Sequence, residues 1–472
     1  MELVKNIRSK IGVEIKAGLG YTLGNFFLKG VAFLTVPIFT RLLTPSDFGV
    51  ISLYTTWVGV FTVLVGLSLD SSVIRAYQDF KEDYDGYLSS VLFLSILPLI
   101  SIIFLGIIFR STISTIIGFP YYIMMLIILQ SYFVFIIGFN NMRYIAQYLY
   151  KKSLLISISN TVLGIIMSII LVLSFSESKY LGKIIGMFIP VLFIAITVFG
   201  VILFKGKNFI NTKYWKYALA LSIPMIPHVL AHLILGQSDR VLINKYIGSD
   251  AVGIYSFAYN IGLISQVLLG SLNNAWVPWF YKKMDENDKG MIISVTNKFI
   301  ALFSFSIIAL IYISPELIKI MGPVNYWEAS AIIPIVILAY FFQFLYTLLV
   351  NIQFYLKKNY FIPVGTIVAA ILNIGLNIYF IPLYGYMAAA YTTLVSYIVL
   401  FLMHYFITNH IFKSNVYKFY LFLRATLIIT LFTLLFYLIQ DVLLLRLGVI
   451  GCVLVYFWTK NKSTIVQFLR RE

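Results

Sequence analysis

Apolar stretches of about twenty residues recur along the whole chain, separated by short polar segments. A helix of ~20 residues crosses the ~30 Å hydrocarbon layer of a bilayer, so each stretch predicts one membrane-spanning helix. The pattern predicts an all-α polytopic membrane protein with about fourteen such helices. We place them at residues 18–40, 48–69, 88–109, 119–139, 154–175, 181–204, 217–236, 251–272, 299–319, 331–352, 361–381, 386–407, 417–439 and 441–459.

Composition excludes a soluble globular protein. Of the 472 residues, 61% are hydrophobic and only 11% are charged, whereas soluble domains carry roughly 25% charged residues. Cys452 is the single cysteine, so a disulfide within the chain is impossible. The net charge of +17 comes from basic residues spread between the apolar stretches, a pattern typical of membrane orientation rather than of nucleic-acid binding.

Lys and Arg are distributed unequally between the two sides of the membrane. If the N-terminus is cytoplasmic, the inner segments hold about 25 of them and the outer segments about seven. This bias predicts that both termini are cytoplasmic and that the number of helices is even. The apolar run from Gly18 follows four basic residues like a signal peptide. It is too long for one and lacks a small-residue cleavage site, so we expect a retained first helix.

An internal repeat links the two halves of the chain at an offset of about 204 residues. The matching pairs are Arg41 and Lys245, Gly49 and Gly253, Ser52 and Ser256, Gly66 and Gly270, and Tyr77 and Tyr281. Both copies begin on the same side of the membrane, which predicts a parallel repeat about a pseudo-two-fold axis along the membrane normal. We therefore expect two six-helix lobes, residues 1–204 and 205–408, followed by a terminal helix pair in residues 409–472.

Two segments resemble a known family. The first runs Gly24-Asn25-Phe26-Phe27-Leu28-Lys29-Gly30, then Pro37 and Thr40-Arg41-Leu42-Leu43-Thr44-Pro45-Ser46-Asp47-Phe48-Gly49. The second runs Ser222-Ile223-Pro224-Met225-Ile226-Pro227-His228, through Ser238-Asp239-Arg240, to Val252-Gly253-Ile254-Tyr255-Ser256. These segments resemble the O-antigen and capsular oligosaccharide flippases. That family is the polysaccharide-transporter branch of the multidrug/oligosaccharidyl-lipid/polysaccharide exporter superfamily.

The resemblance implies a function in surface polysaccharide biosynthesis. Such proteins move undecaprenyl-pyrophosphate-linked repeat units from the cytoplasmic to the outer leaflet of the bacterial inner membrane, by alternating access between two lobes. It also implies contact with membrane lipids, a coupling ion (H⁺ or Na⁺), and a polysaccharide polymerase and glycosyltransferases as neighbouring partners. The terminal helix pair is typical of this lipid-carrier branch.

Lys29 lies near the middle of the first predicted helix. An ammonium at the bilayer centre costs at least ~2.5–3.5 kcal/mol, so it should face protein or a water-filled cavity. One interpretation is a cation that meets the substrate pyrophosphate; the other is a structural lysine that is bonded to carbonyls or snorkels to an interface, although snorkelling reaches poorly from the middle of a helix. Lys183, near the outer end of the sixth helix, is a second candidate substrate contact, or it snorkels to the interface.

No acidic residue falls at the midpoint of a predicted helix, because Asp70, Asp239 and Asp441 sit at helix ends and the others lie in loops or tails. A cation-drug exporter needs a buried carboxylate, whereas basic groups without a central acid favour an anionic substrate. The same absence leaves ion coupling without an obvious acidic site.

Pro224 and Pro227 predict a kink or break in the seventh helix, because proline removes backbone donors. His228 and His232 follow on one face of that helix. As metal ligands they lack a third partner, so no metal site is expected. Either they bond to neighbouring helices or they line a substrate cavity or gate.

Other polar residues interrupt the apolar runs. Uncharged candidates for sugar contacts are Asn260, Gln266, Gln343, Asn373 and Asn377. Interhelical hydrogen bonding explains them equally well. Charged residues at the outer ends of the first and seventh helices form either a charge-paired outer gate or solvated loop charges; they are Arg41, Asp239, Arg240 and Lys245.

Catalytic motifs are missing from the sequence. Neither a phosphate-binding loop nor a dinucleotide fingerprint is present, and no nucleophile and base stand out. We expect no catalytic residue and no cofactor, and therefore a transporter rather than an enzyme. The alternatives are a lipid II flippase, a multidrug exporter and, from another class, a membrane polysaccharide polymerase or glycosyltransferase. The enzymes of that last class would need catalytic acids or a larger outer loop.

The charge count yields a topological prediction. The segment Lys205–Lys216 should be cytoplasmic, so a single cysteine placed at Asn211 should resist an impermeant thiol reagent added to intact cells. The same cysteine should react after the membrane is permeabilised. Labelling from outside intact cells would overturn the helix assignment.

Overall fold

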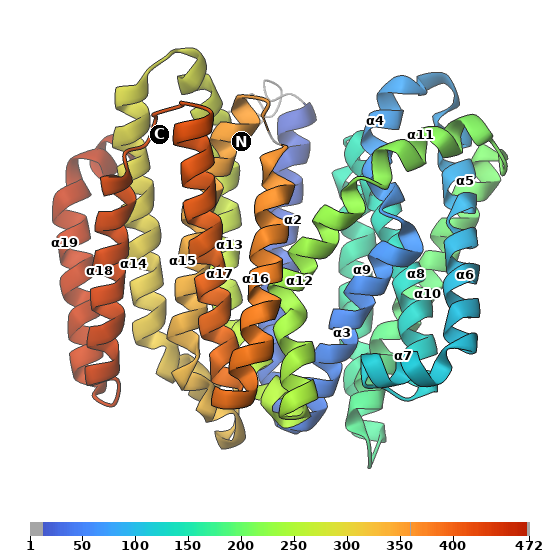
Figure 1. Ribbon diagram of the computed structural model, residues 1–472, viewed down its shortest axis with the longest axis horizontal. Coiled ribbons are helices and arrows are strands. Elements are labelled where there is room, and N and C mark those ends of the chain that lie inside the picture. The colour runs from blue at the N-terminus through green and yellow to red at the C-terminus, as the bar shows by residue number, and fades with distance from the viewer. Residues whose placement is uncertain (1–12, 359, 470–472) are drawn as a thin grey trace, which may run out of the picture. The chain divides into compact units, whose positions relative to one another are not determined.

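The computed structural model describes residues 13–358 and 360–469, and its secondary structure within those residues is entirely helical (Figure 1). The long helices are α2 (Val13–Leu42), α3 (Pro45–Gly66), α8 (Tyr121–Ala146), α9 (Tyr150–Ser174), α10 (Lys179–Gly206), α12 (Met225–Tyr246), α13 (Ser249–Asp285), α14 (Lys289–Met321), α15 (Ile333–Tyr355), α16 (Phe361–Tyr384), α17 (Tyr386–Phe406), α18 (Phe419–Ile439) and α19 (Leu443–Leu469). Shorter helices and turns connect them: η1 (Leu69–Ser72), α4 (Val73–Asp79), η2 (Lys81–Asp83), α5 (Tyr84–Leu94), α6 (Ile96–Ile108), α7 (Arg110–Ile117), α11 (Thr212–Ser222), η3 (Val324–Ala331) and η4 (Ile407–Ile411).

Membrane-spanning helices dominate the described residues. Twelve are long and apolar enough to cross a bilayer, and the bent pair α11–α12 makes a thirteenth if it is counted as one span. A shorter apolar helix, Leu443–Val455, begins α19. Each predicted span coincides with one of these, which confirms the predicted fold class. The basic residues before residue 13 and after residue 469 lie outside the described part of the chain.

The structure corrects one detail of the predicted pattern and confirms another. The polar segment 273–298 was expected to be a loop, but α13 continues to Asp285 and α14 begins at Lys289. An apolar pattern marks only the part of a helix that lies in lipid, and these helices continue beyond it. The predicted helix 217–236 is two helices bent by 42°, with the break at Pro224, as its proline predicts.

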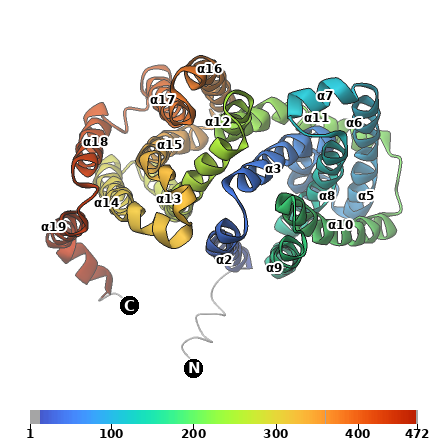
Figure 2. The same ribbon diagram turned by 90° about the horizontal axis from the view of Figure 1, so that it is seen from below.

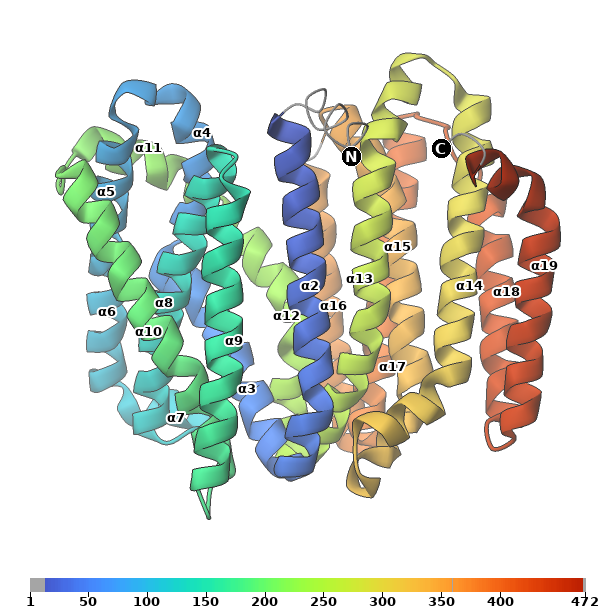
Figure 3. The ribbon, with the colours of Figure 1, turned by 180° about the vertical axis from the view of Figure 1, so that it is seen from behind.

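By its internal contacts the chain divides into two compact units, Met1–Gly253 and Ile254–Glu472. Within unit 1, α2 packs beside α9, as Figure 3 shows, and α9 packs against α10. Within unit 2, α15 and α16 both pack against α17, and Figure 2 views these three helices end on. The predicted boundary between lobes at residues 204 and 205 remains a prediction.

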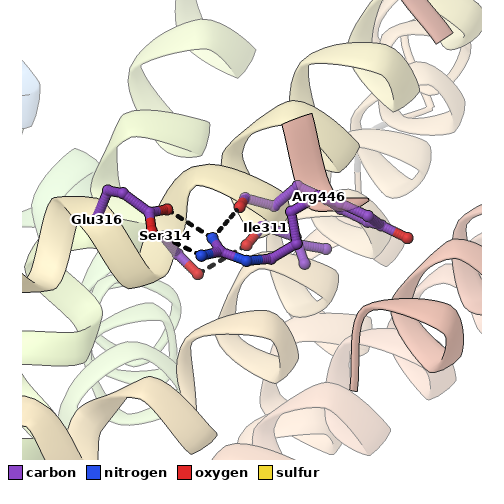
Figure 4. A network of polar contacts seen from close by, with 5 residues as sticks. Ile311, Ser314, Glu316 and Arg446 are labelled. Carbon is purple, nitrogen blue, oxygen red and sulfur yellow. Dashed lines mark hydrogen bonds and ion pairs between the residues drawn. The ribbon is translucent and has the colours of Figure 1, made fainter. Parts of the chain in front are cut away.

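An ion pair between a buried arginine and a partly exposed glutamate joins α19 to α14 within unit 2 (Figure 4). Arg446, which is 3% exposed, donates from Nη2 to Glu316 Oε1 at 2.6 Å and from Nη1 to the carbonyl oxygen of Tyr312 at 2.8 Å. A two-point guanidinium–carboxylate contact has fixed geometry and is stronger than a single neutral hydrogen bond. This contact therefore joins α19, the second helix of the terminal pair, to α14 through polar atoms.

Two glycines let α3 and the first turn of α13 cross closely within unit 1. A Cβ on Gly49 would overlap the carbonyl oxygen of Ser249, and a Cβ on Gly253 would overlap that of Pro45. The hydroxyls of Ser46 and Ser249 are also 2.6 Å apart. The repeat offset that pairs Gly49 with Gly253 also pairs Pro45 with Ser249. The crossing is thus reciprocal, as a two-fold relation between the copies requires, and it supports the parallel repeat.

Gly49→Ala should destabilise the protein. The added methyl group meets backbone that cannot move aside without separating the helices, and overpacking of this kind costs about 1–3 kcal/mol. We expect a lower melting temperature in detergent. The matched control is Gly270→Ala on α13, where nothing lies within 4 Å of the new Cβ. Equal melting temperatures for the two variants would show that the crossing is not tight.

Candidate functional site

Lys29 is the exposed ammonium of α2, within the span Gly20–Leu42. Among the residues that the structure describes, no hydrogen bond or ion pair engages its side chain. Whether Lys29 contacts substrate or snorkels to an interface stays a prediction. A charge placed in an apolar span without a protein partner is a candidate ligand contact.

The packing of α2 sets the direction of Lys29. Gly20 lies against the ring of Tyr150, and Gly24 lies against Leu154, so this face of α2 packs on α9. Lys29 comes nine residues after Gly20, which at about 3.6 residues per turn is half a turn round the helix. Its side chain therefore leaves α2 on the side opposite α9.

Lys183 has a different environment from Lys29. It is half-buried on α10, and its Nζ lies 3.3 Å from the centre of the Phe39 ring on α2. An ammonium over an aromatic face is held by a cation–π interaction. The contact ties α10 to α2, and the role of Lys183 toward substrate stays a prediction.

The bent pair α11–α12 carries both predicted histidines. His228 and His232 stand four residues apart on α12, just after the break; His228 is half-buried and His232 is exposed. The Nδ1 atom of His228 is buried without a hydrogen-bond partner. No group of three or more metal-ligating side chains occurs among the described residues. The pair is therefore placed at a helix break, which in lipid is tolerated where protein or a water-filled cavity satisfies the backbone.

The residues of the predicted outer gate make contacts within unit 1, and their role as a gate stays a prediction. Arg240 donates from Nε to Ser52 Oγ at 3.0 Å, which joins α12 to α3. Arg41 donates to the carbonyl oxygen of Pro37 in its own helix at 2.8 Å. Lys245 is exposed, with its Nζ 5.3 Å from the ring centre of Tyr246.

The sequence suggested that Asp239 lies at a helix end, and the structure corrects this prediction. It lies well inside α12, which continues to Tyr246, and is 1% exposed. The apolar pattern ends near residue 236 because polar residues follow, but the helix continues with those residues packed against protein. Unit 1 therefore contains a buried acid within a candidate span.

In unit 2, two of the predicted polar residues bond between helices. Asn373 Nδ2 donates to Thr393 Oγ1 at 3.1 Å, and Asn377 Nδ2 donates to Asn373 Oδ1 at 3.1 Å. Thr392 donates in turn to Asn377. Both asparagines are fully buried, so these contacts favour the interhelical interpretation of α16 and α17.

The remaining polar candidates are more accessible. Gln343 is half-buried on α15, and its Oε1 lacks a hydrogen-bond partner. Asn260 and Gln266 are half-buried on α13. Their contact with sugar hydroxyls stays a prediction.

Two polar contacts in unit 2 were not predicted. One is the Arg446–Glu316 pair, and the other joins Gln353 Nε2 to His404 Nδ1 at 2.9 Å and to Thr408 Oγ1 at 3.0 Å. His404 and Thr408 are spaced four residues apart at the end of an apolar run, which places them on one helical face. That spacing was the available signal.

The chain is similar in sequence to known polysaccharide biosynthesis proteins. A family model described as polysaccharide biosynthesis protein matches residues 16–284, more than half of the chain. A protein of the Lsg locus of Haemophilus influenzae is 23% identical over 379 residues, covering 75% of this chain and 88% of that protein. The succinoglycan biosynthesis transport protein ExoT of Rhizobium meliloti is 22% identical over 265 residues, covering 55% of this chain and 52% of ExoT.

Solved structures show the same fold. The lipid II flippase MurJ in an inward closed conformation has a TM-score of 0.74 at 17% identity, covering 94% of this chain and 99% of MurJ. An inward-facing multidrug resistance transporter of the MATE family has a TM-score of 0.66 at 12% identity, covering 83% of this chain and 96% of the transporter. Together with the family match, these likenesses confirm the resemblance carried by the two sequence segments. The chain belongs to the polysaccharide biosynthesis protein family and is a multi-pass membrane transporter of that family.

Proposed function

We propose that this protein is a flippase that carries undecaprenyl-pyrophosphate-linked oligosaccharide repeat units from the cytoplasmic to the outer leaflet by alternating access. The observation that carries the proposal is Lys29, an exposed ammonium inside a membrane span without a protein partner among the described residues. A polysaccharide-family transporter must accommodate the anionic group that joins lipid to sugar. A cation at this depth suits that group.

Electrostatics supports a pyrophosphate as the partner of Lys29. Two unit charges 4 Å apart at an effective dielectric near 20 attract by about 4 kcal/mol before desolvation. A pyrophosphate offers several anionic oxygens, and part of that attraction suffices to change affinity severalfold, since ~1.4 kcal/mol is a factor of ten.

A multidrug exporter is a second alternative, because a transporter of the MATE family shares the fold. Glu316 of α14 is paired with Arg446, whereas α12 contains the buried acid Asp239. The lipid II flippase is the stronger alternative because lipid II also carries a pyrophosphate, and this chain shares the fold of MurJ. A polymerase or glycosyltransferase lacks support from the family and from the shared fold.

Deleting the protein should abolish a surface glycan while lipid-linked repeat units accumulate on the cytoplasmic leaflet. The physical reason is that a pyrophosphate and its sugars cannot cross lipid unaided. The measurement is the sidedness of labelled repeat units in the deletion strain. Repeat units that accumulate facing outward would indicate a polymerase instead, and loss of lipid II from the outer leaflet would indicate the lipid II flippase.

Lys29→Gln should insert normally and lose most glycan export, whereas Lys29→Arg should keep a substantial part of it. The charge, rather than the shape of the side chain, is expected to attract the substrate. Export is measured at matched membrane abundance of each variant, because a misfolded protein would also fail. Normal export by the Gln variant would remove Lys29 from the substrate contacts.

A further inference from the structure

The segment that joins α10 to α11 is fastened to α5, although residues 207–211 have no regular secondary structure. Ser89 Oγ donates to the carbonyl oxygen of Asn208 at 2.9 Å and accepts from the N–H of the same residue at 3.2 Å. Ser90 Oγ accepts from the N–H of Asn211 at 3.1 Å. Because three backbone groups of the segment bond to two side chains of α5, its own side chains extend from a fixed backbone.

The helix that follows, α11, packs on η1 and α5 at the end of unit 1 that also holds α4 (Figures 1 and 3). Trp215 Nε1 donates to the carbonyl oxygen of Ser90 at 3.0 Å, which fixes α11 on α5. The buried residues of α11 recur every four positions, as one face of a helix requires; they are Tyr214, Ala218 and Ser222. The opposite face of α11 is therefore left without a protein neighbour of this kind.

Four exposed lysines follow one another along this part of the chain, and we call them the basic patch. They are Lys205, Lys207, Lys213 and Lys216. At about 3.6 residues per turn, Lys213 and Lys216 lie on the face of α11 opposite its buried residues. The Nζ of Lys213 lies 5.9 Å from the centre of the Phe80 ring. Among the residues that the structure describes, no carboxylate forms an ion pair with any of the four lysines.

The acids at this end of unit 1 do not neutralise the basic patch. Glu82 is exposed, and the other three are bonded to groups outside the patch: Asp79 to Arg75, Asp83 to Tyr214 and Asp85 to Arg143. Because two of these acids are already paired with arginines, positive charge remains in excess on this face. A strong anion is the partner that such a face attracts.

Apolar side chains lie between these lysines in the sequence and are exposed as well. Phe204 is 81% exposed and Ile210 is 69% exposed, and Phe209 is also exposed. Phe204 belongs to the last turn of α10, whose candidate membrane span ends at Gly206. Apolar groups beside amines at the end of a span are typical of the lipid interface, where the apolar groups enter the acyl region and the amines stay among the headgroups.

We propose that the basic patch binds the headgroups of anionic phospholipids. A lysine near an anionic lipid surface is attracted to it, whereas a zwitterionic headgroup has no net charge to offer. The exposed Phe204, Phe209 and Ile210 favour a lipid surface over an acidic protein, because they need hydrocarbon rather than water. Since α11 is the first half of the bent pair α11–α12, bound lipid holds one side of that bend at the membrane surface. The site is separate from Lys29 and does not depend on the proposed flippase function.

Hydrogen exchange of residues 205–222 should report this binding. The full chain is placed in nanodiscs of phosphatidylcholine alone, or of equal parts phosphatidylcholine and phosphatidylglycerol. We expect exchange in this segment to be severalfold slower with phosphatidylglycerol, because bound headgroups suppress local opening. Equal exchange in the two lipids would overturn the proposal. Inorganic phosphate added to phosphatidylcholine nanodiscs should not slow exchange, and equal slowing by phosphate would show a simple anion site instead of a lipid surface.

Variants that remove charge locate the effect. Replacing all four lysines of the basic patch by Gln should abolish the slowing, and phosphatidylglycerol affinity in detergent should fall by about tenfold or more. The matched control loses the same charge at other exposed lysines, through Lys151→Gln, Lys152→Gln, Lys282→Gln and Lys289→Gln. The control should keep the response to phosphatidylglycerol, and so should a variant with Arg at all four patch positions. A response that survives in the Gln variant, or that the control loses to the same extent, would refute the basic patch as the lipid site. Equal melting temperatures in neutral detergent verify that the variants fold.

Discussion

The need to satisfy backbone hydrogen bonds in lipid governs this structure. Bilayer hydrocarbon offers no donors or acceptors, so a spanning segment must pair its own peptide groups within a helix. The described residues are accordingly helical throughout their candidate spans. The interruptions are then the informative places: the left-handed turn at Leu67 and Ser68 after α3, the bend between α11 and α12, and the π-helical turn Ile407–Ile411. Ser71 donates to Ser222 between the first two, and Gln353 donates to Thr408 in the third.

Helix association in such a protein depends on close approach and on a few polar contacts, because lipid tails are as apolar as leucine. The glycine crossing of α3 with α13, the asparagine contacts between α16 and α17, and the Arg446–Glu316 pair illustrate the three available means. The sequence analysis offered the asparagine contacts as one of two interpretations. It predicted neither the glycine crossing nor the Arg446–Glu316 pair. Asn373 and Asn377, two of the candidates for sugar contacts, take part in hydrogen bonds of this kind.

Charged groups within the spans lie in different surroundings. Arg446 and Glu316 cancel each other, and Lys183 lies on an aromatic ring. Lys29 lies on an exposed face of α2 without an ion pair among the described residues, and Asp239 is a buried acid inside α12.

The sequence by itself determined the class of the protein. Apolar stretches of fixed length located every span, and motifs around Gly24–Gly49 and Ser222–Ser256 indicated the family, because lipid constrains length and composition directly. Pro224 predicted the break in the seventh helix, since its missing N–H acts locally. The repeat offset brought Gly49 and Gly253 into correspondence without showing that they cross. The tertiary structure alone decided that Asp239 is buried inside a helix, that Arg446 reaches Glu316, and that Ser71 meets Ser222. These facts depend on which faces of distant helices pack together, and hydrophobicity along the chain does not record this.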